Sequence, residues 1–86
     1  MELERIRRLN EQQRRELLLE DLTMSEMKAV IAETILTEEN IKIAELRFLK
    51  LYTGEKIAER LGYDDRTIAN RIKFIKDRLR NTIVNI

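Results

Sequence analysis

Hydrophobic and polar positions follow a helical period along this chain, most regularly near the C-terminus. The apolar positions there, which we call the apolar row, are Ile68, Ile72, Ile75, Leu79 and Ile83, spaced four, three, four and four residues apart. This spacing places all five side chains on one face of an α-helix. We therefore predict a long amphipathic helix that begins after Asp64 and turns the apolar row towards the hydrophobic core.

Residues that favour helix N-termini divide the rest of the chain into shorter helices. Thr23 and Glu26 have the spacing of a capping box, and Thr37 precedes two glutamates that suit a first helical turn. Thr53 and Asp64 can cap the last two helices in the same way. With no proline and two glycines, the chain favours helices throughout, so we predict an all-α fold without β strands.

The stretch IAERLGYDDRTIANRI, residues 57–72, fits two helices joined by a tight turn. Gly62 follows the first helix, and glycine adopts the left-handed backbone that turns the chain sharply. Ala58 is small enough to let two helices cross closely. We predict a helix-turn-helix over about 53–80, within a domain of residues 36–86.

Residues 1–35 are predicted to form an N-terminal helical arm. A helix over 2–20 would be amphipathic at both ends and polar in the middle, at NEQQRRE. The apolar residues that follow either fold back over the final helix or pair with a second subunit. We favour a homodimer, because so small a domain has little core to bury them, and the residues proposed for this contact are Leu17, Leu18, Leu22 and Phe74.

The composition excludes several classes of chemistry. The chain has no cysteine, histidine or tryptophan, which removes disulfides, thiolate and imidazole catalysis and the usual zinc sites. Asp64 and Asp65 are adjacent, yet no glycine-rich phosphate loop accompanies them. We therefore expect no enzyme, no metal site and no cofactor. We also expect no membrane span and a cytoplasmic location, because no apolar run approaches the length of a bilayer span or a signal core.

Positive charge is concentrated in the final helix. The net charge is +1, but residues 66–80 carry six basic side chains against the single acid Asp77. Arginine and asparagine can bind guanine and adenine edges, and lysine suits phosphates. A solvated helix face is the alternative interpretation of the same pattern. The candidate DNA-binding residues are Asp65, Arg66, Thr67, Asn70, Arg71, Lys73 and Lys76.

A further pattern covers about half of the chain. Its positions, in order, are Leu36-Thr37, Leu46-Arg47-Phe48, Thr53, Ile57-Ala58, Leu61-Gly62, Thr67-Ile68, Arg71-Ile72 and Leu79-Arg80. In these positions residues 36–80 resemble region 4 of bacterial sigma-70-type factors, which recognises a promoter element and contacts RNA polymerase. The first 35 residues have no counterpart in that region; small phage or mobile-element regulators related to it carry private N-terminal helices, and this chain is similar to them.

Three functions follow as hypotheses. The first is a sequence-specific regulator of transcription that binds double-stranded DNA with residues from about 65 to 80 in the major groove. The second is a mimic of sigma region 4 that binds RNA polymerase or a sigma partner without reading DNA, which the acidic Asp64 and Asp65 favour. The third is a phage accessory protein for DNA packaging or recombination.

Overall fold

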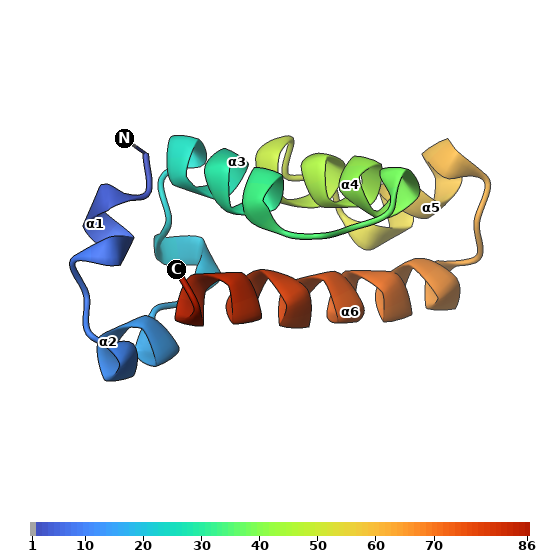
Figure 1. The fold of residues 1–86 in the computed structure, drawn as a ribbon. Helices are drawn as coiled ribbons and strands as arrows, with labels where there is room; N and C mark the ends of the chain where they lie inside the picture. The colour runs from blue at the N-terminus through green and yellow to red at the C-terminus, as the bar shows by residue number, and fades with distance from the viewer. Residues whose placement is uncertain (1) are drawn as a thin grey trace.

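The longest helix, α6 (Asp65–Val84), forms the base on which the other helices pack (Figure 1). A computed structural model describes residues 2–86. Over one side of α6 lie α3 (Met24–Glu33), α4 (Glu38–Ala44) and α5 (Gly54–Leu61), while α1 (Glu4–Arg7) and α2 (Glu11–Glu16) lie at its C-terminal end. A 3₁₀ turn, η1 (Leu19–Asp21), lies between α2 and α3. A π-helical turn, η2 (Glu45–Leu49), lies between α4 and α5. Residues 2–86 contain no β strand, which confirms the all-α prediction.

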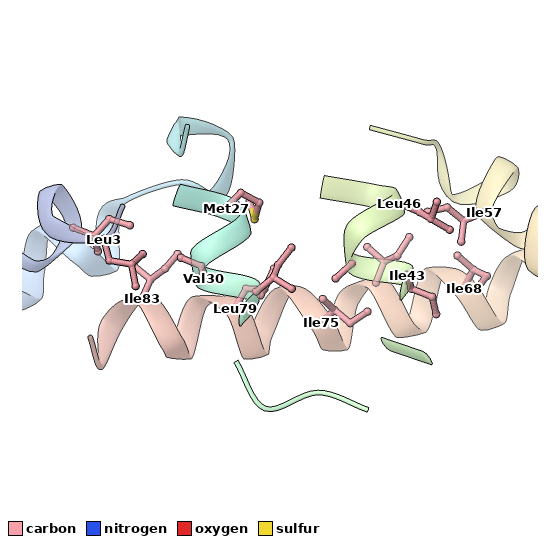
Figure 2. Packing of buried hydrophobic residues seen from close by; sticks show 14 of the residues in the cluster. Leu3, Met27, Val30, Ile43, Leu46, Ile57, Ile68, Ile75, Leu79 and Ile83 are labelled. Atoms are coloured by element: carbon pink, nitrogen blue, oxygen red, sulfur yellow. The ribbon is translucent and has the colours of Figure 1, made fainter. Parts of the chain in front are cut away.

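The apolar row of α6 forms the centre of the core, as predicted. All five of its side chains are buried. They join one hydrophobic cluster that includes Leu3 near one end of the row and Ile57 near the other (Figure 2). Because this cluster takes buried side chains from α1 and α3 as well as from α4 to α6, residues 2–35 and 36–86 share a single core.

Each predicted N-terminal cap forms. Thr23 accepts a hydrogen bond from the Glu26 amide at 3.1 Å, and the Glu26 carboxylate accepts one from the Thr23 amide at 2.9 Å, which completes the capping box. The side chains of Thr37, Thr53 and Asp64 each accept a backbone N–H from the first turn of the helix that they begin. Polar side chains close to each start therefore set where α3 to α6 begin.

The turn between α5 and α6 also forms as predicted. Gly62 has a φ of 76°, and the Tyr63 amide donates to the Ala58 carbonyl at 2.9 Å, which closes the end of α5. Ala58 is buried where α5 packs against α6. The C-terminal part of the chain is thus a helix-turn-helix unit.

The N-terminal segment differs from the single helix expected over 2–20. It forms two short helices, because Asn10 begins a new one: its side chain accepts from the Gln13 amide, and the Gln13 side chain accepts from the Asn10 amide. This break lets α1 turn Leu3 and Ile6 into the core, whereas α2 has no buried residue. The arm folds back onto α6, which is one of the two arrangements that the sequence left open, the other being pairing with a second subunit.

A bidentate ion pair fastens α1 to α3. The Nε and Nη2 atoms of Arg5 each lie 2.8 Å from a carboxylate oxygen of Glu26, and Nη2 also donates to the Asp21 carbonyl at 3.2 Å. Glu26 is buried, although Arg5 is half exposed. The hydrogen bonds from Arg5 hold the pKa of the Glu26 carboxyl below its ordinary value, against the opposing effect of burial.

The Glu26 contact predicts a specific loss of stability in acid. Because its folded-state pKa is lowered, the charge on Glu26 stabilises the fold above about pH 4.5, and this contribution disappears as the pH falls through the folded pKa. We expect Glu26→Gln to flatten the acid side of a plot of unfolding free energy against pH. Glutamine can still complete the capping box, so the substitution removes mainly the charge. Urea unfolding between about pH 3 and pH 7 measures the slope.

The control is Glu33→Gln, which changes an exposed glutamate on the same helix and should keep the wild-type slope. Equal slopes for the two variants would contradict the prediction.

Candidate nucleic-acid interface

One face of α6 carries exposed polar side chains on the side away from the core. Arg66, Asn70, Lys73 and Asp77 are spaced four, three and four residues apart, so they form one stripe along the helix. All four are exposed. Within residues 2–86, no hydrogen bond or ion pair holds the side chains of Arg66, Asn70 or Lys73. We call these three residues the outward stripe, and they are free to contact a ligand.

Arg71, another predicted DNA contact, is held by the protein itself. Its guanidinium forms an ion pair with Glu39 of α4 and lies 5.2 Å from the centre of the Tyr63 ring. The Tyr63 hydroxyl donates to the same carboxylate. The bond from Tyr63, followed by those from Arg71, lowers the pKa of Glu39, and the carboxylate in turn raises the pKa of Tyr63. A base contact by Arg71 would first have to break this ion pair, so its position indicates a brace between α6, the turn and α4.

The other predicted DNA contacts lie outside the outward stripe. Asp65 is exposed in the first turn of α6 beside the capping residue Asp64, and Thr67 is half-buried. Lys76 lies on the flank of α6 that faces α3 and η2, where it lines a surface groove. The seven candidates therefore divide between the outward stripe, the Glu39 brace, the first turn and the groove.

A basic pair on α5 was missed in the sequence. The Nζ atom of Lys56 lies 4.2 Å from the centre of the Tyr52 ring, and Nη1 of Arg60 donates to the Tyr52 hydroxyl at 3.5 Å. In a helix-turn-helix protein the first helix crosses the DNA backbone, where such side chains suit phosphates. The signal was present as two basic residues four positions apart after a tyrosine. Glu55 and Glu59, however, give α5 an equal number of acids.

The residues predicted to form a dimer contact have different surroundings. Leu17 and Leu22 are half-buried against the core of their own chain. Leu18 and Phe74 are about half exposed, and the Arg78 guanidinium lies 6.0 Å from the centre of the Phe74 ring. Folding back of the arm therefore accounts for part of the apolar area that suggested a dimer. The homodimer itself stays a prediction.

Two structural properties bear on other classes of ligand. Between residues 2 and 86, no three or more acidic side chains gather in a way that could hold a metal ion. Over the same residues, no helix combines the length and the apolar character that crossing a membrane requires.

Comparisons of this chain with models of protein families, with curated proteins and with solved structures found no match. The resemblance to sigma region 4 therefore depends on the residues of the chain alone.

Proposed function

We propose that this protein binds double-stranded DNA through the outward stripe of α6 and regulates transcription. The observation that carries the proposal is that Arg66, Asn70 and Lys73 are exposed and unpaired on one face, directly after a closed helix-turn-helix turn. Arginine can bind two acceptors of guanine, and asparagine can bind adenine in the same bidentate way. Lysine at the third position suits a phosphate.

The architecture supports insertion of α6 into the major groove. The major groove accepts a single α-helix, and the first half of α6 carries all three residues of the outward stripe. The apolar row and the Arg71–Glu39 ion pair hold the opposite side and one flank of the helix against the rest of the domain. A helix fixed in this way meets the DNA as a rigid element, which lowers the entropy cost of binding.

A second candidate is a protein-interaction module that mimics sigma region 4 and binds RNA polymerase or a sigma partner. Two observations favour it. Asp77 continues the outward stripe, and Asp65 directly precedes Arg66 in the first turn of α6, so both acids would repel nearby phosphates. The ion pair with Glu39 also takes up the charge of Arg71. The two candidates differ in whether the protein recognises a duplex of defined sequence.

Selection from a pool of random duplex DNA tests the proposal. We expect repeated rounds with the full chain at low salt to enrich a motif, because base contacts discriminate between sequences whereas phosphate contacts do not. Binding of the enriched duplex and a scrambled duplex is then measured at several salt concentrations. If no motif is enriched, or if the enriched and scrambled duplexes bind with equal affinity, the protein-interaction module is favoured.

A further inference from the structure

A second surface feature of the protein is a groove that is distinct from the outward stripe in its residues. It has a volume of about 480 Å³ and lies between the start of α3, the segment before it, η2 and the second half of α6. Residues far apart in the chain form its walls, among them Leu18, Met24, Leu51 and Arg80. It does not include any residue of the outward stripe.

Large apolar side chains are exposed in this groove. Leu51 is 68% exposed, Met24 52% and Leu18 46%. Most other large apolar residues of this protein are buried or half-buried, so three exposed ones in a single groove are unusual. An exposed apolar cluster bordered by polar residues is typical of a binding surface for another protein.

The backbone is strained at Leu51, one of the exposed residues of the groove. Leu51 has a φ of 61°, a left-handed conformation that a leucine rarely adopts. It follows η2, where the Lys50 amide donates to the Glu45 carbonyl in the wider spacing of a π-helix. Glycine would relieve this strain, yet the position carries a leucine that contributes little to the core. Strained backbone and π-helical turns both gather at functional sites.

The charges around the groove indicate what kind of partner would fit. Arg47, Lys76 and Arg80 border it, against the single acid Glu20. The Arg47 side chain is fixed by a hydrogen bond from Nη1 to the Tyr52 carbonyl at 3.3 Å. Two copies of this chain joined symmetrically through the groove would bring these basic residues close to each other. A partner with acidic side chains would pair with them instead.

We propose that this groove binds an acidic amphipathic helix of another protein. Apolar side chains on one face of that helix, at helical spacing, contact Leu18, Met24 and Leu51, and acidic residues beside them pair with Arg47, Lys76 and Arg80. The inference does not depend on DNA binding, since the groove shares no residue with the outward stripe.

The test is selection from a displayed library of helical peptides about 16 residues long, long enough to form a helix on binding. Each peptide keeps an apolar face, while the flanking positions vary freely between glutamate and lysine. We expect the full chain to enrich peptides with glutamate at the flanks. Leu51→Gly and Arg80→Glu should each weaken binding of the enriched peptides by about tenfold or more, as loss of a central interface contact does.

Stability and control measurements on the variants show whether the groove itself binds the peptides. Glycine suits the left-handed backbone of residue 51, so Leu51→Gly should fold at least as stably as the wild type, which a thermal melt verifies. Ile35→Asn is the matched control, because Ile35 is 84% exposed but outside the groove, and it should bind the peptides as the wild type does. Leu51→Gly should also leave DNA affinity unchanged. The proposal is overturned if no peptide is enriched, or if the enriched peptides carry lysine at the flanks. It is also overturned if Leu51→Gly and Arg80→Glu both bind the peptides as the wild type does. A wild-type dimer in sedimentation that Leu51→Gly abolishes would overturn it as well.

Discussion

Replacing both Arg66 and Asn70 by alanine is expected to remove most of the preference for the selected duplex over a scrambled one. Each bidentate base contact contributes about 1–3 kcal/mol of discrimination, so the pair should contribute about 2–6 kcal/mol. Both side chains are exposed and unpaired, so their loss should leave the fold intact. Fluorescence anisotropy measures the affinity of the variant and of the wild type for each duplex, and urea unfolding verifies the fold.

Lys73→Ala is the matched control on the same stripe. Lysine at this position is proposed to contact a phosphate, so its loss should weaken binding to both duplexes alike. It should also reduce the slope of log affinity against log salt by about one unit. If the double variant, with Arg66→Ala and Asn70→Ala, keeps both the wild-type affinity for DNA and the wild-type preference for the selected duplex, the outward stripe does not read DNA. The protein-interaction module then becomes the leading candidate.

Arg71 shows why a candidate site is harder to predict than a fold. Arg71 was predicted to contact a base because it lies in the final helix and occupies a position of the sigma region 4 pattern. Its partner Glu39 lies 32 residues earlier in the chain, on α4, and the turn residue Tyr63 bonds to the same carboxylate. Such a pair depends on how α4 packs beside α6, which no local pattern reveals.

The parts of the fold that could be predicted depend on local chemistry. A cap such as Thr23 and its partner Glu26 are three residues apart, and Gly62 adopts its backbone conformation whatever packs around it. The apolar row of α6 follows from helical spacing alone. Sequence therefore predicted the starts of α3 to α6, the turn and the central face of the core.

The features that were missed arise where local preferences compete or distant segments meet. At Asn10 a capping box interrupts a segment that also has helical spacing, so two short helices form and α1 places Ile6 in the core. At Leu51 a leucine adopts a backbone that favours glycine, so no turn signal marked the end of η2. The apolar groove combines residues from the arm, η2 and α6, and it becomes visible in the folded chain.

The packing of the arm leads to the second large effect. Ile6→Ala is expected to lower the free energy of unfolding by about 2–5 kcal/mol, the usual cost of removing a buried isoleucine side chain beyond its β-carbon. Ile6 is fully buried in the core that also contains Ile83. Because α1 is short and near the chain end, it can partly close the cavity, so we expect the lower half of this range.

Leu18→Ala is the control from the same arm. Leu18 is about half exposed, so its substitution should cost less than Ile6→Ala. Urea unfolding of both variants, repeated at two protein concentrations, distinguishes packing within one chain from packing between chains. If the arm served only a second subunit, Ile6→Ala would leave the unfolding of the dilute protein unchanged and alter only its concentration dependence. A contact between copies weakens on dilution, whereas a contact within one chain does not. A large loss of stability at both concentrations would therefore show that the arm belongs to the core of its own chain.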